Sequence, residues 1–174
     1  MTAWIRAAAP LVALALAGVT PASEEAGLTA RRDLAQVEAR ARAWRADAVL
    51  VHLSTMRARP DGTAAEWKYS FASLASGKRC VVTARPGTVT VREVPLGSYR
   101  APLGDFIDSD KAMAAARAHG LKGREPSMSV QRPAGAGPEA TAWIVTGGWA
   151  AGDTSVTVDA RSGAVLRRAV MGKD

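Results

Sequence analysis

An internal repeat limits the folds open to this chain more than any other feature. Shifting the sequence by 76 positions (158 minus 82) aligns VTARPGTV at residues 82–89 with VDARSGAV at residues 158–165, and five of the eight residues are the same. The same shift, without a gap, places Trp67 on Trp143 and Gly87 on Gly163. A repeat of this length predicts two similar structural units stacked in one chain. We therefore expect each of these residue pairs to occupy equivalent positions.

Each unit is predicted to begin with a helix. Before the first repeat, apolar residues recur at three- and four-residue steps, which is the period of one helical face. This pattern predicts a helix over about residues 30–45, with Thr29 as its N-cap. In the second unit, Asp108 or Ser109 is a suitable N-cap and Gly120 is placed to end the helix in a left-handed conformation.

The rest of each unit is predicted to be a series of antiparallel strands. In EWKYSF at residues 66–71, aromatic and polar residues alternate strictly, so Trp67, Tyr69 and Phe71 share one face, which we expect to pack on the helix. Turn signals rich in Gly, Pro, Ser and Asp separate such runs. The predicted fold class is α+β, with two helix-plus-antiparallel-meander units at residues 29–95 and 106–174. The Pro- and Gly-rich stretch PLGSYRAPLGD at residues 95–105 is the predicted boundary.

The C-terminal half resembles a known family. The stretch AWIVTGGWAAGDTSVTVDARSGAVL at residues 142–166, behind an Ala-rich helix, is similar to the PepSY domain of exported bacterial proteins. The resemblance covers residues 108–170, and the first unit only through the internal repeat. It implies a small cystatin-like module outside the cytoplasm, which in some members restrains peptidases. It brings no catalytic residues.

Asp159 has two interpretations. It could close a hairpin by accepting hydrogen bonds from turn amides, with Gly163 supplying a positive φ, or it could bind a cation or transfer a proton. The repeat favours the hairpin, because the alignment of its two copies matches Gly87 with Gly163 but has Thr83 at the position of Asp159. The candidate partner-binding or structural residues are Trp67, Tyr69, Trp143, Trp149, Asp159 and Gly163.

The residue pattern contains no recognisable catalytic or metal-binding motif. His52 and His119 have no metal-type partner three or four residues away, and Cys80 lies in an apolar strand pattern where a buried thiol is inert. Asp108 and Asp110 fit a helix cap better than a cation loop. The sequence therefore predicts a protein that is not an enzyme, with no catalytic residues, no cofactor and no metal.

The N-terminus predicts export from the cytoplasm. Residues 1–22 carry one Arg, an apolar run too short for a stable anchor and then small residues, which is typical of a signal peptide cleaved near Ser23. A retained N-terminal anchor is the alternative, and since no Cys follows the apolar run a lipid-anchored lipoprotein is not indicated. The predicted location of the mature chain is the periplasm or the exterior, without a stable membrane anchor. The net charge of +7 is spread as isolated Arg and Lys, which does not favour nucleic acid as a partner.

Two functions of different classes follow. The first is a noncatalytic exported binding or regulatory module of PepSY type, which contacts a peptidase, a peptide or another component of the cell envelope. The second is a protein that binds a small hydrophobic ligand, or isomerises it, in a pocket between helix and sheet. The second requires a polar group aimed into that pocket, for which Tyr69 and His52 are the candidates.

Overall fold

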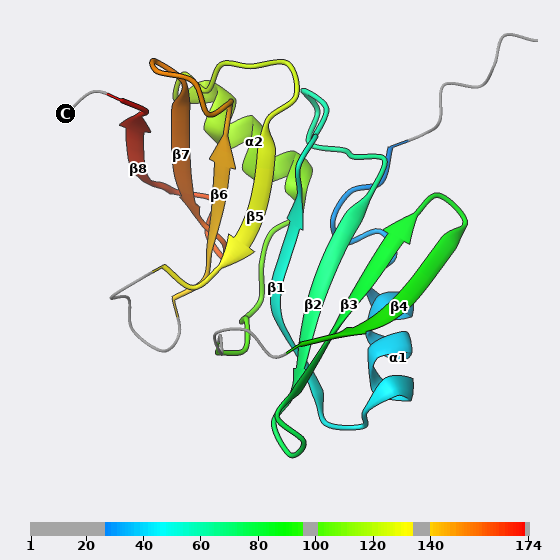
Figure 1. The fold of residues 1–174 in the computed structure, drawn as a ribbon. Coiled ribbons are helices and arrows are strands. Elements are labelled where there is room, and N and C mark those ends of the chain that lie inside the picture. The colour runs from blue at the N-terminus through cyan, green and yellow to red at the C-terminus, as the bar shows by residue number, and fades with distance from the viewer. Residues whose placement is uncertain (1–26, 96–100, 134–139, 173–174) are drawn as a thin grey trace, which may run out of the picture.

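The fold is described from a computed structural model for residues 27–95, 101–133 and 140–172 (Figure 1). The elements in chain order are α1 (Leu34–Trp44), β1 (Ala48–Thr55), β2 (Trp67–Ser73), β3 (Lys78–Arg85), β4 (Thr88–Val94), α2 (Ser109–Ala118), β5 (Ser127–Gln131), β6 (Ala142–Thr146), β7 (Thr154–Asp159) and β8 (Val165–Val170). The predicted signal peptide lies outside these residues. Within them, no helix has the length and apolar character needed to cross a membrane.

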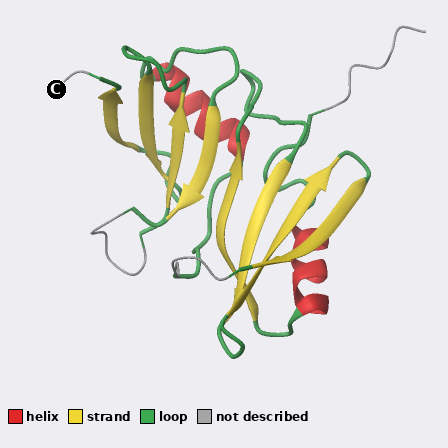
Figure 2. Ribbon diagram, in the orientation of Figure 1, coloured by secondary structure: helices red, strands yellow, loops and turns green. Residues whose placement is uncertain are grey.

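The strands form one continuous antiparallel sheet, which corrects the predicted fold class. The order of the eight strands is β4-β3-β2-β1-β5-β6-β7-β8, so the prediction of two helix-plus-meander units is wrong (Figure 2). The sequence pattern identified strands but contained no local signal for the long-range pairing of β1 with β5. That pairing merges the two expected sheets into one.

The join between β1 and β5 lies at the middle of the sheet. Leu53 pairs with Val130, Ser54 with Ser129 and Thr55 with Met128. β1 also pairs with β2 on its other side, so the first strand of the chain is an interior strand. The outer strands of the sheet are β4 and β8.

Both helices cover the same face of the sheet, and the core lies between them and that face (Figure 1). The predicted alternation of buried and exposed side chains in β2 is confirmed. Trp67, Tyr69 and Phe71 are buried on the helix side, while Lys68, between Trp67 and Tyr69, is exposed. From α2, small residues and Met113 reach the same core. The other face of the sheet, which we call the helix-free face, is open in Figure 1.

The segment before α1 differs from the prediction. α1 begins at Leu34 rather than near Ala30, and the residue before it, Asp33, makes no side-chain cap hydrogen bond. Side chains from the second half of the chain hold the preceding backbone instead: Ser109 Oγ accepts from Ala30 N at 3.0 Å, and Asp108 Oδ1 accepts from Arg31 N at 2.9 Å. These amides would lack intrahelical acceptors even in a helix that began near Ala30. The carbonyl of Ala30 is what differs, because it accepts from the Tyr69 hydroxyl while Leu34 N donates to Arg31 O, so the α-helical ladder begins later.

The ends of α2 follow the sequence closely. Asp108 is the N-cap, and its side chain accepts a hydrogen bond from Ser109 N at 2.8 Å. Gly120 follows the helix with a φ of 85°, as a left-handed helix end requires. The prediction for this helix is confirmed.

Candidate functional site

Three of the six candidate residues lie in the core. Trp67 and Trp143 are fully buried, and their rings meet edge to face with centroids 6.0 Å apart. Each indole N–H donates to a backbone carbonyl that precedes a helix: Trp67 to Leu28 O at 2.8 Å, and Trp143 to Ile107 O at 3.0 Å. Buried indoles need such partners, so these side chains stabilise the junction of the two halves and are not accessible to a partner.

Tyr69 is the third buried candidate. Its hydroxyl donates to Ala30 O at 2.7 Å. Burial, with lesser effects of Asp33 and Asp108, raises the pKa of Tyr69 well above its ordinary value. The phenol is therefore neutral and engaged in a structural hydrogen bond.

Asp159 and Gly163 lie at the hairpin between β7 and β8. One carboxylate oxygen, Asp159 Oδ1, accepts from Ser162 N at 2.7 Å, from Arg161 N at 3.1 Å and from Ser162 Oγ at 2.7 Å. The Ser162 amide is the main cause of the lowered pKa of Asp159. Gly163 has a φ of 77°, which a side chain disfavours. This geometry is that of a hairpin corner, and Gly87 takes a similar φ of 72° at the corresponding corner between β3 and β4.

The two halves nevertheless differ in strand register. Trp67 pairs with Ala84, whereas Trp143 pairs with Val158. The 76-residue shift would instead place Ala160 opposite Trp143. Each tryptophan is held in a similar way, but the hairpins around them are offset by two residues.

Trp149 stands apart from the other tryptophans of the described chain, because 69% of it is exposed. It lies in the link between β6 and β7, beside a hollow of about 460 Å³ on the helix-free face. We call this the central hollow. Its floor is formed by Ser54, Ser129 and Ile144, and its rim by His52, Met56 and Trp149.

The floor of the central hollow follows from strand pairing. Ser54 on β1 is opposite Ser129 on β5, which is opposite Ile144 on β6. A second row crosses the same face, with Ser127 opposite Thr146 and Thr146 opposite Ser155. The hydroxyls of Thr146 and Ser155 lie 3.1 Å apart. The junction of β1 and β5 thus creates a site that neither half contains alone.

Hydrogen bonds within the β6–β7 link hold Trp149 at the rim. Asp153 Oδ2 accepts from Ala150 N at 2.7 Å, and Asp153 N donates to Ala150 O at 3.0 Å. A Cβ at Gly148 would lie 2.3 Å from Asp153 Oδ2, so a glycine is needed there for the carboxylate to reach the link. These contacts order the backbone on both sides of Trp149.

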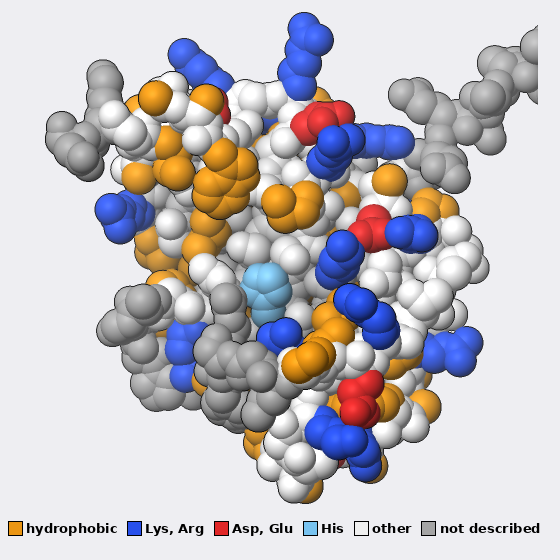
Figure 3. All heavy atoms as spheres, in the orientation of Figure 1, with side chains coloured by type: hydrophobic (Ala, Val, Ile, Leu, Met, Phe, Trp, Pro, Cys, Tyr) orange, Lys and Arg blue, Asp and Glu red, His pale blue; other side chains and the backbone are white. Residues whose placement is uncertain are grey.

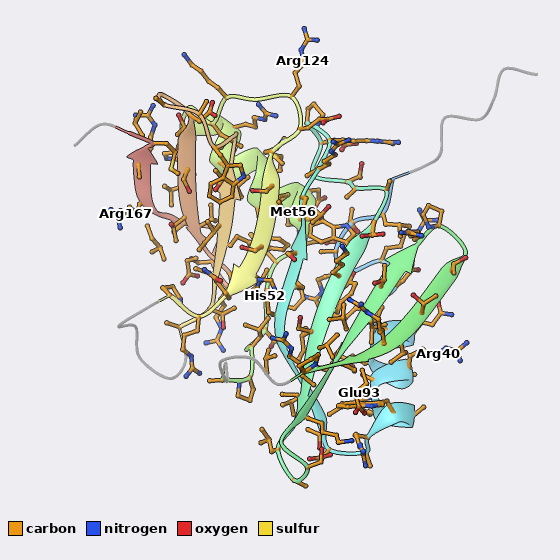
Figure 4. All side chains as sticks on the ribbon, viewed as in Figure 1. Arg40, His52, Met56, Glu93, Arg124 and Arg167 are labelled. Carbon is orange, nitrogen blue, oxygen red and sulfur yellow. The ribbon has the colours of Figure 1, made fainter. Side chains whose placement is uncertain are left out.

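The central hollow is electrically neutral. The described residues that line it include no Asp, Glu, Lys or Arg, although those four types make up 22% of the chain. Figure 3 shows a pale blue histidine near the middle of this face, where Figure 4 labels His52, with white uncharged surface and orange apolar patches above it. Met56 is also labelled in Figure 4, and 66% of it is exposed. The hollow therefore combines hydroxyl groups, one imidazole and exposed apolar side chains.

A second groove lies on the helix side, between α1, β1 and residues 102–106. It has a volume of about 480 Å³, and its lining mixes apolar residues such as Leu34 and Phe71 with charged ones such as Arg42 and Glu38. Arg42 and Glu38 form an ion pair at 2.9 Å. This groove is thus charged at its edge, unlike the central hollow.

Tyr69 and His52 lie on opposite faces of the sheet. His52 pairs with Ser70, the neighbour of Tyr69, and successive residues of a strand point to opposite sides. Tyr69 faces the helices, and His52 lines the central hollow. The two polar groups considered for a ligand pocket cannot act on the same ligand.

The remaining titratable candidates are dispersed. Cys80 is buried, and burial, followed by the charge of Glu93, raises the pKa of its thiol to about 11. His119 ends α2, where its Nδ1 lies 2.9 Å from Ala115 O. In the part of the chain that the structure describes, no three His, Cys, Asp or Glu residues are grouped in a way that could hold a metal ion.

Sequence reasoning missed the floor of the central hollow. The alternation in SMSVQ places Ser127, Ser129 and Gln131 on one face, but it does not show which strand lies beside β5. Only the pairing of Ser129 with Ser54 adds the side chains of β1 to the hydroxyls of β5, β6 and β7. Trp149 had a usable signal, because a large aromatic residue in a Gly-rich link is seldom needed for a turn.

Comparisons with known proteins give a fold but no family. No family model and no curated protein matches the sequence, so the PepSY resemblance stays a prediction. Among solved structures, a protein from Clostridium difficile 630 described as a putative lipoprotein is similar, with a TM-score of 0.52 and 13% sequence identity. The likeness covers 78% of this chain and 91% of that one. At this identity, the comparison supports the fold alone.

Proposed function

We propose that this chain is a noncatalytic, exported binding module that uses its helix-free face to contact a component of the cell envelope. The observation that carries the proposal is the central hollow, a neutral depression on a paired sheet with Trp149 and Met56 exposed at its rim. Exposed large apolar side chains gathered around a depression favour recognition of a partner. The similar solved structure is described as a putative lipoprotein, which agrees with a role in the envelope.

The filled core favours a binding role over the alternative of an isomerase. Trp67, Tyr69 and Trp143 fill the centre of the core, and all three have their polar atoms engaged. The groove beside α1 and β1 remains, but the Arg42–Glu38 ion pair lies at its edge. A reaction on a hydrophobic ligand needs a polar group aimed into an apolar cavity. Tyr69 does not meet that need, because its hydroxyl is bound to Ala30 O.

The proposal is tested by affinity capture from a cell-envelope extract, followed by mass spectrometry. The wild-type chain is compared with the double variant Met56→Ala/Trp149→Ala and with Leu74→Ala, which alters an exposed side chain (54% exposed) in the β2–β3 link. We expect wild type and Leu74→Ala to retain the same components and the double variant to lose them. Equal retention by all three proteins would contradict the use of this face.

Export itself needs a separate measurement. We expect N-terminal sequencing of protein recovered from outside the cytoplasm to begin near Ser23. Recovery of intact Met1 there would contradict the cleaved signal peptide, without bearing on the binding face.

A further inference from the structure

We infer that the central hollow binds a short, neutral oligosaccharide. This inference rests on the proposed function, since it names the class of ligand for the same face. The lining, the spacing of the hydroxyl groups and the position of Trp149 each limit that class independently.

The charge of the lining residues is the first property that restricts the class of ligand. The described lining residues carry no formal charge apart from any proton on His52, so the hollow offers no counter-ion to a phosphate or a carboxylate. The row of the floor continues past Ser54 to Lys68, whose Nζ lies 3.2 Å from Glu66 Oε1. Lys68 lies outside the lining of the hollow and shares Glu66 with Arg85. Within the lining an anionic ligand therefore finds no Lys or Arg partner, whereas a neutral ligand needs no counter-ion.

The arrangement of polar groups is the second limit. Hydroxyls of adjacent strands, such as Ser54 and Ser129, stand on the same face roughly 5 Å apart, because the strands themselves are about 4.8 Å apart. Each hydroxyl both donates and accepts. A sugar ring presents hydroxyl groups of the same dual character, and hydroxyls on non-adjacent carbons of a ring can reach two neighbouring strands.

A peptide strand fits this arrangement less well. The backbone groups of β1, β5 and β6 are already used within the sheet, so an added strand could not form main-chain hydrogen bonds from this face. A purely hydrophobic ligand would cover the hydroxyls of the floor without giving them partners, which is unfavourable. A peptide strand and a hydrophobic ligand would each interact favourably with only part of the lining.

The apolar rim is the third limit. Trp149 and Met56 are more than half exposed, and Ile144 lies in the floor opposite Ser129. The face of an indole ring is electron-rich and packs well against C–H groups of partial positive charge. Sugar rings have such C–H faces beside their hydroxyls, so one ligand satisfies both the rim and the floor.

The size of the site agrees with a short chain of sugars. The volume of about 460 Å³ lies within the range of small-ligand sites, which is roughly 300–1,000 Å³. The hydrogen bonds of Asp153 hold the backbone beside Trp149 before a ligand arrives. Such order lowers the entropic cost of binding.

The test measures binding of defined probes to the full-length protein. Chitotetraose, cellotetraose and maltotetraose are the neutral oligosaccharides, tetragalacturonic acid is the anionic one, and Ala-Ser-Ala-Ser with blocked ends is the neutral peptide. Binding is measured by calorimetry and by the protection of Trp149 from acrylamide quenching. We expect at least one neutral oligosaccharide to bind and to reduce quenching, and the anionic one to bind more weakly by at least about tenfold, which is one decade in Kd.

Two variants locate the binding. Trp149→Ala removes the rim, and Ser129→Glu places a carboxylate in the floor. The control for the second is Thr83→Glu, because Thr83 lies on the same row, opposite Lys68, but outside the hollow. We expect each of the two variants to weaken binding by about tenfold or more, and the control to change it by less than about twofold. Circular dichroism establishes that each variant is folded.

Several outcomes would overturn the inference. One is the absence of binding for all three neutral oligosaccharides at up to about 10 mM, a concentration at which even a millimolar Kd is measurable. Another is equal weakening by Thr83→Glu and Ser129→Glu. If only the peptide binds, and Trp149→Ala abolishes that binding, the sugar assignment fails while the proposed function stands. If the envelope capture also fails, the proposed function falls with it.

Discussion

Replacing Ser109 with Ala should reveal how strongly the two halves of the chain depend on each other. Ser109 is the first residue of α2 and is fully buried, and its hydroxyl accepts from the buried amide of Ala30 at 3.0 Å. In Ser109→Ala that amide has lost its acceptor. Leaving a buried donor without a partner costs about 1–3 kcal/mol, a large fraction of a domain stability of roughly 5–15 kcal/mol.

Urea unfolding measures this cost. With a loss of about 2 kcal/mol and a slope of about 2 kcal/mol/M, the midpoint should fall by about 1 M. Unfolding is followed by circular dichroism and by tryptophan fluorescence, to which Trp67 and Trp143 contribute from the two halves of the sheet. We expect both signals to change together in wild type and in the variant, because one core contains residues of both halves.

The control is Ser76→Ala, which removes an exposed hydroxyl bonded to Ser73 Oγ in the β2–β3 link. A surface change of this kind should cost less than about 0.5 kcal/mol. The reasoning is refuted if Ser109→Ala is no less stable than Ser76→Ala. Separate transitions for the two signals would refute the claim that the halves unfold as one unit.

Four further predictions concern single residues. Asp159→Asn should cost less than about 1 kcal/mol, because Oδ1 accepts the hydrogen bonds from Arg161 N, Ser162 N and Ser162 Oγ, and an amide keeps that oxygen. Gly163→Val should cost more than about 1 kcal/mol, because its φ is 77° and a Cβ would lie 3.4 Å from Ile107 Cδ1; melting temperatures of both variants decide the order. Folding lowers the pKa of Asp159 below its ordinary value of 3.8, so the stabilisation by its carboxylate is present above pH 3.8 and is lost as the pH falls through the folded pKa. The difference in stability between wild type and Asp159→Asn should therefore shrink in acid. A difference that grows in acid would contradict the direction of this pKa shift. Cys80 should react with a thiol reagent at pH 8 only when the chain unfolds, because it is buried and its pKa is raised to about 11; rapid labelling of the native protein would contradict its burial.

The local elements of this fold could be predicted from the sequence, because their signals are local. The alternation of Trp67, Tyr69 and Phe71 identified the buried face of β2, and Asp108 and Gly120 marked the ends of α2. Each of these patterns reflects a preference of a few neighbouring residues. Such preferences survive folding when tertiary contacts agree with them.

The start of α1 and the joining of the sheet could not be predicted in this way. Ala30 and Arg31 look helical by composition, but their amides bind Ser109 and Asp108, which lie more than 70 residues away. The pairing of Ser54 with Ser129 likewise depends on contacts with no local signal. The central hollow belongs in part to this second class, because His52, Ser54 and Met56 join the hydroxyls of β5 and β6 only after β1 and β5 have met.

The interior position of β1 has a consequence for the order in which the chain folds. During synthesis, residues 48–55 emerge with a run of strand-forming side chains, AVLVHLST, but β5 begins only at Ser127. Until then, the end of β1 that pairs with β5, from Leu53 to Thr55, presents unpaired N–H and C=O groups, which is the kind of edge on which aggregation begins. β5 therefore covers an edge of the first half of the sheet that would otherwise be exposed. Chains that end before Gln131 should aggregate even though all the strands from β1 to β4 have been made.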